Sequence, residues 1–341
     1  MLSRTIIAAA AATFTALVAG QAMAGAKLDA IKARGELLCG VSTGLAGFSI
    51  ADSQGKWTGI DVDVCKAVAA ALFGDANKVK FVPLSAQQRF TALQSGEVDV
   101  LSRNTTWTQQ RDTALGLNFT GVTYYDGQGF MVAKKLGVKS AKELTGATVC
   151  VQPGTTTELN LADWGRANKV SFKPVVIEKL EEIEQAFFSG RCDAYTTDAS
   201  GLAATRASKA PKPDDYTLLP EIISKEPLGP AVAHGDDQLA DLFRWTFNAL
   251  VEAEEYGITA AKVEEMKKSD NPGIKRLLGV TPGLGKNLGV SEEWAANAIK
   301  AVGNYGEMYE RNVGKGSALK LDRGLNALWN AGGIMYSPPV R

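Results

Sequence analysis

The segment A-L-Q-S-G-E-V-D-V-L-S, residues 92–102, decides the fold of this chain. Its first part is typical of a helix that ends at Gly96, because glycine readily takes the left-handed conformation that closes helices. Its second part is an apolar run typical of a short buried strand. The pattern recurs in A-F-F-S-G-R-C-D, residues 186–193, where a strand again opens with an aspartate. A looser echo links residues 39–44 with 150–155. Chance similarity is the alternative, but two echoes in the same order favour two similarly built lobes.

Strand and helix patterns alternate along the chain around residues 92–102. Apolar runs at 35–41 and 78–84 indicate strands, and apolar residues four apart indicate a helix over 61–73. This order predicts an α/β fold in which each lobe has a mainly parallel sheet flanked by helices. Ligands bind such sheets at the carboxyl ends of the strands.

Two extended segments are expected to join the lobes as a two-strand hinge near 129–134 and 228–234. The second lobe, 132–232, is then inserted into the first, which consists of 25–131 and 233–341 and carries a helical extension at its C-terminal end. Two crossings of this kind form a hinge that can close.

Residues 1–24 have the features of an export signal that is cleaved after Ala24. Arg4 supplies the positive end, residues 6–18 form a short apolar run, and Ala22-Met23-Ala24 is the small-x-small cleavage pattern. A membrane anchor is the alternative, but the run is short and interrupted by threonine.

The charge balance and the cysteines exclude several classes of partner. The 37 basic and 37 acidic residues leave no basic surplus, so no nucleic-acid partner is expected. Four cysteines in an exported chain favour disulfides, with four buried free thiols as the alternative. The chain has a single histidine, His234, and no C-x-x-C spacing, so no metal site is expected.

Arg111 and Asp198 are the sharpest candidates for ligand binding. Arg111 follows the strand 98–102, and a guanidinium grips a carboxylate with two parallel bonds. Its alternative role is a surface salt bridge with Asp112. Asp198 follows the strand 192–196 and suits an ammonium group, while its alternative role is to cap the next helix.

Thr155 and Thr156 precede a helix over 158–168, whose free N–H groups attract anions. Capping by threonine is the alternative, and both roles can hold together. With Thr106, these residues form a set that fits an α-amino acid zwitterion. No Ser-His-Asp arrangement and no base for a cysteine nucleophile are available, so neither an enzyme nor a cofactor is expected.

Six motifs extend this interpretation along the chain after residue 24. They are C-G-V-S-T-G-L-A-G-F (39–48), W-T-G-I-D-V-D-V-C-K-A-V-A-A-A (57–71), R-F-T-A-L-Q-S-G-E-V-D-V-L-S-R-N-T-T-W-T (89–108), V-C-V-Q-P-G-T-T-T-E (149–158), G-R-C-D-A-Y-T-T-D (190–198) and L-W-N-A-G-G-I-M-Y-S-P-P-V-R (328–341). The motifs resemble those of the periplasmic solute-binding proteins of ABC transporters, in the polar amino-acid class. Within that class they resemble the general L-amino-acid-binding branch of Gram-negative bacteria.

The resemblance implies a two-lobed periplasmic protein that closes on an L-amino acid and delivers it to permease subunits in the inner membrane. A monomer is expected. By the resemblance, Arg111, Thr106, Thr155 and Thr156 hold the ligand carboxylate, and Asp198 and the backbone at Asn104 hold its ammonium. The alternative on the same scaffold is a periplasmic dehydratase acting on aromatic amino-acid precursors.

The expected side-chain pocket has small residues where narrow-specificity relatives place an aromatic ring. Thr43 and Ser85 lie in the two loops concerned, which predicts broad specificity. Arg103 either reaches the ligand's side chain or rims the cleft, and Trp107 is expected to pack under the loop. Within the two-lobed picture, disulfides inside each lobe leave the hinge free to move, so the expected pairs are Cys39–Cys65 and Cys150–Cys192.

Overall fold

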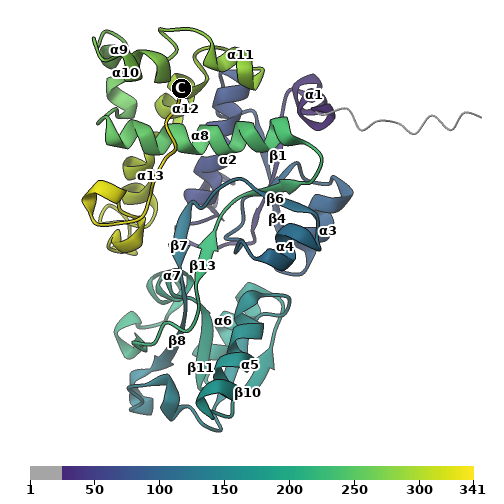
Figure 1. Cartoon of the computed structure of the whole chain (residues 1–341). Helices are drawn as coiled ribbons and strands as arrows, with labels where there is room; N and C mark the ends of the chain where they lie inside the picture. The colour runs from purple at the N-terminus through teal and green to yellow at the C-terminus, as the bar shows by residue number, and fades with distance from the viewer. Residues whose placement is uncertain (1–24) are drawn as a thin grey trace, which may run out of the picture.

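The computed structural model describes residues 25–341, and the predicted export signal lies outside them. The chain folds into two lobes, each built on a five-stranded sheet (Figure 1). This confirms the predicted α/β, two-lobed architecture. Within residues 25–341 we found no helix with the length and apolar character needed to cross a membrane.

The first sheet belongs to the lobe that contains the N-terminal part of the chain. Its strands, in spatial order, are β4 (Val79–Leu84), β1 (Leu37–Ser42), β5 (Val100–Leu101), β14 (Ala231–Ala233) and β6 (Leu117–Phe119). β1 runs parallel to β4 and β5, whereas β14 is antiparallel to β5 and β6. Further elements of this lobe are α1 (Ala26–Arg34), β2 (Ile50–Ala51), β3 (Trp57–Thr58), α2 (Ile60–Phe73), α3 (Gln88–Ser95), α4 (Gln109–Thr113) and α8 (Asp237–Glu255).

The second sheet repeats this plan. Its strands, in spatial order, are β10 (Lys173–Val176), β9 (Thr148–Val151), β11 (Ala194–Asp198), β8 (Gln128–Ala133) and β12 (Tyr216–Leu218). β9 is parallel to β10 and β11, and β8 is antiparallel to β11 and β12. The helices of this lobe are α5 (Thr156–Asn168), α6 (Leu180–Phe188) and α7 (Ala199–Lys209).

Gly96 and Gly190, the paired glycines of the sequence echo, have φ values of 78° and 82°. Both are therefore in the left-handed region that other residues avoid.

A two-stranded ribbon of β7 (Tyr124–Asp126) and β13 (Glu226–Leu228) lies between the two sheets (Figure 1). The crossings pack closely, since a Cβ on Gly229 would lie 1.9 Å from the carbonyl oxygen of Gly121. Residues 128–133 already form a strand of the second sheet, close to the predicted hinge at 129–134. The exact bounds of the lobes stay a prediction.

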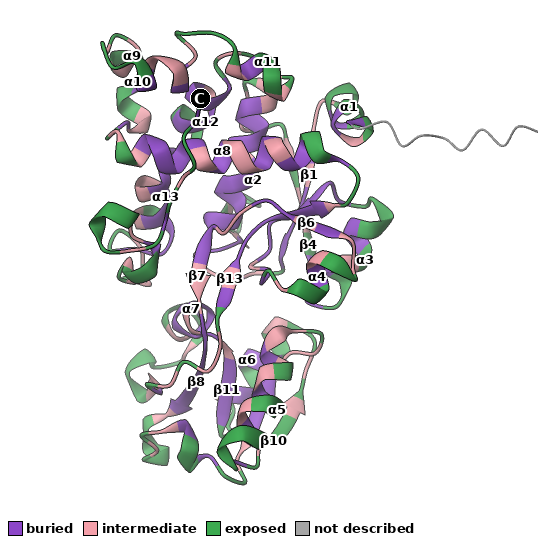
Figure 2. Ribbon diagram, in the orientation of Figure 1, coloured by how far each residue is buried: buried purple, intermediate pink, exposed green. Residues whose placement is uncertain are grey.

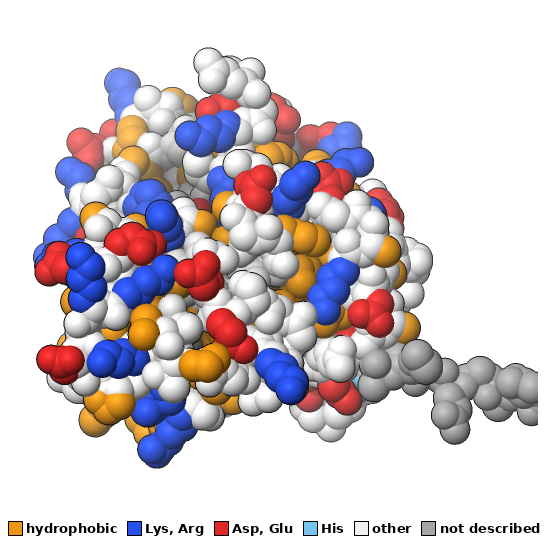
Figure 3. All heavy atoms as spheres, turned by 90° about the horizontal axis from the view of Figure 1, so that it is seen from above, with side chains coloured by type: hydrophobic (Ala, Val, Ile, Leu, Met, Phe, Trp, Pro, Cys, Tyr) orange, Lys and Arg blue, Asp and Glu red, His pale blue; other side chains and the backbone are white. Residues whose placement is uncertain are grey.

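The C-terminal extension completes the core of the first lobe. Its helices are α9 (Val263–Met266), α10 (Pro272–Leu277), α11 (Leu284–Leu288), α12 (Trp294–Val302) and α13 (Tyr305–Asn312). Of these, α12 and α13 pack against both α2 and α8, α11 packs against α8, and α9 packs against α12. Trp294, Tyr305 and Tyr309 are fully buried there, and helix α2, against which α12 and α13 pack, is mainly purple (buried) in Figure 2. Viewed along the long axis, the outer face of this lobe shows basic and acidic side chains interspersed (Figure 3). No single-sign stripe is visible on that face, in keeping with the balanced composition.

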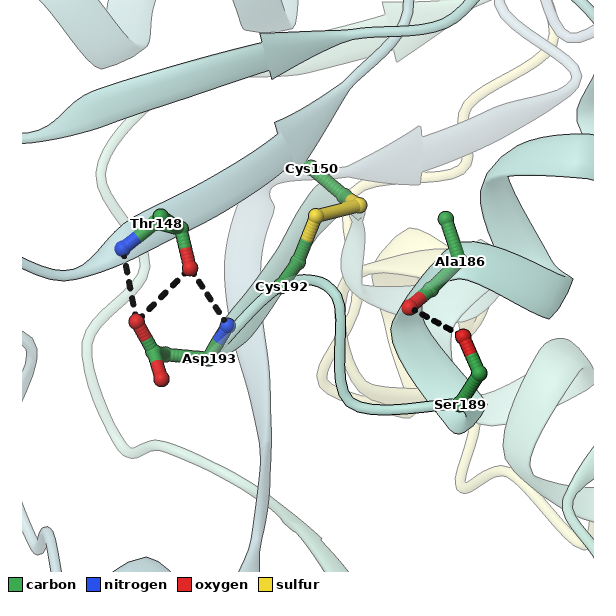
Figure 4. The surroundings of a disulfide bond; sticks show 6 residues. All are labelled: Thr148, Cys150, Ala186, Ser189, Cys192 and Asp193. Carbon is green, nitrogen blue, oxygen red and sulfur yellow. Dashed lines mark hydrogen bonds between the residues drawn. A yellow bond between two sulfur atoms is a disulfide. The ribbon is translucent and has the colours of Figure 1, made fainter.

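Each lobe contains one disulfide. Cys39 of β1 is bonded to Cys65 of α2, and Cys150 of β9 is bonded to Cys192 just before β11. These are the pairs expected from the two-lobed picture. Figure 4 shows the second bond beside Thr148, whose main-chain N–H and hydroxyl both donate to the Asp193 carboxylate at 2.8 and 2.7 Å. Both cross-links leave the β7–β13 ribbon free of covalent restraint.

Candidate ligand-binding site

The segment after β5 directs Arg111 into the interior between the lobes. Thr108 caps α4 by accepting a hydrogen bond from the main-chain N–H of Arg111 at 3.2 Å. The guanidinium is buried, donates from Nη1 to the main-chain oxygen of Thr106 at 2.9 Å, and lies 5.0 Å from the ring centre of Phe90. Within residues 25–341 no carboxylate forms a salt bridge with it, so the alternative pairing with Asp112 does not occur. Burial lowers the pKa of Arg111 to about 10, while the charges of Glu226 and Asp198 raise it, so the side chain stays cationic at neutral pH.

Asp198 is the complementary charge. It ends β11 with 7% of its surface exposed and makes no capping hydrogen bond to α7. The main-chain N–H of Ser200 instead donates to Asp126 at 3.4 Å, so the capping alternative is not supported. Burial raises the pKa of Asp198 well above its ordinary value, and the charges of Asp126 and Glu226 raise it further. The positive charges of Arg89 and Arg111 act in the opposite direction and lower this pKa. A carboxylate in this environment is stabilised by a cationic partner.

The two threonines before α5 have different roles. Thr155 caps the helix, because its hydroxyl accepts from the Glu158 N–H at 3.1 Å and donates to the Gln152 main-chain oxygen at 2.7 Å. Thr155 therefore has the helix-capping role that the sequence offered as its alternative. The Thr156 hydroxyl lies 3.3 Å from that of Thr106, so the structure brings two of the predicted ligand-binding hydroxyls together across the lobes.

Asn104 forms the turn that precedes Thr106. It adopts a φ of 33°, and its main-chain N–H donates to the Asp61 carboxylate at 2.8 Å. The side-chain oxygen of Asn104 is buried without a hydrogen-bond partner in the described part of the chain. This side chain therefore has a free buried acceptor, in addition to the main chain at Asn104 that was predicted to hold the ammonium.

Thr43 and Ser85 lie further out, in a cavity of about 420 Å³ between the lobes. The Ser85 hydroxyl crosses the gap and donates to Glu178 at 2.8 Å. The remaining wall includes Gln152 and Glu184 of the second lobe. The cavity carries both predicted side-chain residues, and it has no aromatic lining.

Two buried arginines adjoin Arg111. Arg103, left open by the sequence, does not rim the cleft: it is buried, and its Nε donates to the main-chain oxygen of Leu84 at 3.1 Å. Burial lowers the pKa of Arg103 to about 10, and the charge of Asp61 opposes this. Arg89 was not recognised from sequence. Its guanidinium donates to the main-chain oxygen of Gly154 at 3.4 Å, and its Nε is buried without a partner among residues 25–341.

Trp107 packs on Phe119 of β6 with ring centres 5.6 Å apart, as expected for a residue beneath the loop. Its other face is open, since 40% of its surface is exposed.

Three further acids were also missed by the sequence analysis: Asp61 and Glu226 are buried, and Asp126 is half-buried. Asp61 lies in the first turn of α2, Asp126 ends β7, and Glu226 begins β13 directly opposite Asp126. Burial raises the pKa of Asp61 to about 7 and that of Asp126 to about 6. The available signals were an aspartate within the apolar run I-D-V-D-V and a glutamate inside the return crossing E-P-L-G-P.

Glu226 is the most highly connected of these acids. One carboxylate oxygen accepts from the hydroxyls of Thr106 at 2.6 Å and Thr156 at 2.9 Å. The other accepts from the Asn160 amide at 2.8 Å and the Ser224 hydroxyl at 2.6 Å. None of these acids belongs to a metal-binding cluster, because residues 25–341 contain no group of three or more His, Cys, Asp or Glu side chains placed to hold an ion.

Comparisons with known proteins agree with this geometry. The family model of bacterial extracellular solute-binding proteins, family 3, matches residues 37–263. The general L-amino acid-binding periplasmic protein AapJ of Rhizobium johnstonii is 59% identical over 342 residues, which is 100% of both chains. The glutamate/glutamine/aspartate/asparagine-binding protein BztA of Rhodobacter capsulatus is 59% identical over 327 residues, 96% of each chain. An ABC transporter periplasmic binding protein from Brucella ovis, solved with glutathione bound, has a TM-score of 0.90 at 61% identity, covering 92% of this chain and 99% of that one.

Proposed function

The chain belongs to the bacterial extracellular solute-binding proteins of family 3, and on this basis we propose that it captures L-amino acids of several kinds in the periplasm and delivers them to the permease of an ABC transporter. Its relatives are transport proteins and not enzymes, and none of them favours the dehydratase alternative. The chain is accordingly a binding protein, with transport as its role.

One observation carries the proposal. Arg111 and Asp198 are buried charges of opposite sign that lie near each other, come from different lobes, and have no salt-bridge partner within residues 25–341. An isolated buried charge is costly unless a counter-charge neutralises it. An α-amino acid supplies a carboxylate for Arg111 and an ammonium for Asp198 on one carbon atom.

The other predicted residues take roles consistent with their positions. We assign the hydroxyls of Thr106 and Thr156 to the ligand carboxylate and the main chain beside Asn104 to its ammonium. Thr155 acts indirectly, because its capping bonds hold the start of α5 in place. We assign Thr43 and Ser85 to the ligand's side chain, because both line the cavity between the lobes.

Release of the ligand requires the lobes to separate. Three contacts join them across the cleft: Thr106 with Thr156, Ser85 with Glu178, and Arg89 with Gly154. All three pair a residue before β7 with one between β7 and β13. We infer that the ribbon of these strands is the hinge, so that the residues before β7 and after β13 form one lobe and the residues between these two strands form the other. The same proposal includes that the protein is a monomer and that its export signal is cleaved after Ala24.

A second ligand class is favoured by the 420 Å³ cavity beside Thr43 and Ser85. That space exceeds the needs of a small amino-acid side chain, and the Brucella ovis relative was solved with glutathione bound. We infer that the cleft also admits larger ligands with a free α-amino acid end, glutathione among them.

Thermal shift and calorimetry with the common L-amino acids and glutathione test the proposal. A ligand at 100 times its Kd stabilises a protein by about 2.7 kcal/mol, which gives a clear shift in Tm. Arg111→Gln should remove the shift, whereas Arg166→Gln, an exposed arginine paired with Asp163 on α5, should leave it unchanged. Absence of binding by the wild-type protein, or full binding by Arg111→Gln, would contradict the proposal.

A further inference from the structure

Glu226 lies at the point where the hinge ribbon meets both lobes. Its side chain is 1% exposed, and its strand β13 pairs with β7 so that Glu226 faces Asp126. The segment that carries Thr106 is fastened to the same strand, because the Trp107 main-chain N–H donates to the Pro227 oxygen at 2.8 Å. The carboxylate is therefore held beside the predicted ligand position by the fold itself.

The four hydrogen bonds of Glu226 fall into two pairs. Oε1 accepts from Asn160 and Ser224, neither of which has an assigned role toward the ligand. Oε2 accepts from the hydroxyls of Thr106 and Thr156, the same hydroxyls that the proposed function assigns to the ligand carboxylate. A threonine hydroxyl has a single hydrogen to donate. Once the two hydroxyls turn to a ligand carboxylate, Oε2 loses both of its donors.

A buried carboxylate oxygen without a donor is unfavourable, so Oε2 needs a replacement. The ligand brings one with it. In an α-amino acid the ammonium nitrogen is attached to the carbon that bears the carboxylate, and both threonine hydroxyls lie within 2.9 Å of Oε2. A carboxylate bound at these hydroxyls therefore places its own ammonium group next to Oε2.

We propose that Glu226 is a ligand-binding residue whose Oε2 accepts a hydrogen bond from the α-ammonium, in exchange for the hydroxyls of Thr106 and Thr156. The inference rests on the proposed function. An ammonium group has three hydrogens, and the site then supplies three acceptors: Asp198, Glu226 and the main chain beside Asn104. Asn160 and Ser224 keep Oε1 in place throughout the exchange, so the carboxylate is oriented before the ligand arrives.

The proposal makes the α-ammonium, and not only the α-carboxylate, a requirement for tight binding. Calorimetry should compare L-glutamate with L-2-hydroxyglutarate, and L-leucine with L-2-hydroxyisocaproate, because each hydroxy acid replaces only the ammonium. Glu226→Gln keeps the shape of the side chain. The variant should weaken binding of the amino acids by roughly 10- to 150-fold, which is the loss expected for one hydrogen bond to a charged group. Binding of the hydroxy acids should weaken much less, because they have no ammonium group.

Two control variants separate this role from a structural one. Ser224→Ala removes a donor that orients the Glu226 carboxylate, so it should weaken the amino acid more than the hydroxy acid of a pair, but by a smaller factor than Glu226→Gln does. Glu221→Gln changes a glutamate of the same lobe that bonds to the Ala141 main-chain N–H at 3.0 Å, and it should leave both affinities unchanged. An equal loss of both ligands in Glu226→Gln would overturn the proposal and make Glu226 only a contact between the lobes.

A crystal structure of the wild-type protein with a bound amino acid gives an independent answer, even if Glu226→Gln does not fold. The ammonium nitrogen should lie within hydrogen-bond distance of Oε2, with the hydroxyls of Thr106 and Thr156 on the ligand carboxylate. A complex in which both hydroxyls still donate to Glu226 overturns the inference and leaves the proposed function standing. If the wild-type protein binds no amino acid at all, the proposed function fails and the inference falls with it.

Discussion

Replacing Asp198 by asparagine is expected to stabilise the ligand-free protein and to remove most of its affinity for amino acids. Asp198 is 7% exposed, and its side chain has no hydrogen-bond or salt-bridge partner within residues 25–341. Two further acids, the half-buried Asp126 and the buried Glu226, raise its pKa in addition to the effect of burial. Asparagine has nearly the same shape but no charge, so the substitution removes the repulsion without opening a cavity.

The two effects have opposite signs and separate magnitudes. Relieving an unfavourable charge commonly stabilises a protein by about 0.5–2 kcal/mol, which corresponds to a rise in Tm of a few degrees for a chain of this size. Removing one partner of a buried charge pair in a complex costs about 2–5 kcal/mol. That loss is a factor of roughly 30 to 4,000 in Kd for the amino acid.

Urea unfolding without ligand and calorimetry with ligand measure the two effects on the same preparation. Asp193→Asn is the matched control, since Asp193 precedes the same strand and bonds to Thr148 on the protein surface (Figure 4). The hydrogen bonds from Thr148 lower the pKa of Asp193, the opposite of the shift at Asp198. Asp193→Asn should therefore destabilise the protein and leave the Kd unchanged.

Two results would refute this reasoning. If Asp198→Asn destabilised the ligand-free protein, the carboxylate would have a stabilising role that its surroundings do not reveal. If the variant kept the wild-type Kd, Asp198 would not be the ammonium partner.

Three further expectations concern pH, the disulfide of the second lobe and the extension. Burial raises the pKa of Asp126 to about 6, so the folded state binds the proton of this carboxyl group more tightly than the unfolded state does. The free energy of unfolding without ligand should therefore fall as the pH rises from about 4 through about 6. A cationic ammonium group beside Asp198 and Glu226 also favours the ionised form of the neighbouring Asp126. Calorimetry in buffers of different ionisation enthalpy should therefore show proton release on binding, and the affinity should fall as the pH drops through about 6. Replacing Cys150 and Cys192 by serine should lower the free energy of unfolding by about 2–4 kcal/mol, because the bond closes a loop with a sequence separation of 42; an unchanged urea midpoint would contradict this. Arg323→Lys should destabilise the protein by about 1 kcal/mol at unchanged Kd, because lysine cannot reproduce the two bonds to Glu254 at 3.0 and 3.1 Å; equal stability would show that the pair is not needed.

Local features of the chain were sufficient to predict the alternation of strands and helices and the two-lobed plan. Each helix–glycine–strand unit has a hydrophobic pattern and a helix-ending glycine within about ten residues, and Gly96 and Gly190 take the left-handed conformation that this pattern requires. The sequence also pointed to Arg111 and Asp198, because each follows a strand at the end of the sheet where ligands bind.

The roles of single hydroxyls could not be assigned in this way. Thr155 and Thr156 are adjacent and chemically identical, yet one caps α5 and the other donates to Glu226 of the hinge ribbon. The direction in which α5 starts decides between these roles, and that direction depends on how the second sheet packs. Arg103 was ambiguous for the same reason, since its burial depends on the neighbouring strand that offers the oxygen of Leu84.

The amino-acid sequence by itself determined the repeating α/β pattern and the two charges that suit a zwitterion, because these depend on hydrophobic periodicity and on residues adjacent to strand ends. Only the tertiary structure decided which groups surround those charges. Glu226 lies 120 residues from Thr106 and 70 from Thr156 along the chain, yet its carboxylate accepts hydrogen bonds from both. Such contacts form when the second crossing pairs with the first and both lobes pack against the ribbon. Their partners are therefore set by the packing of distant segments, which no local pattern encodes.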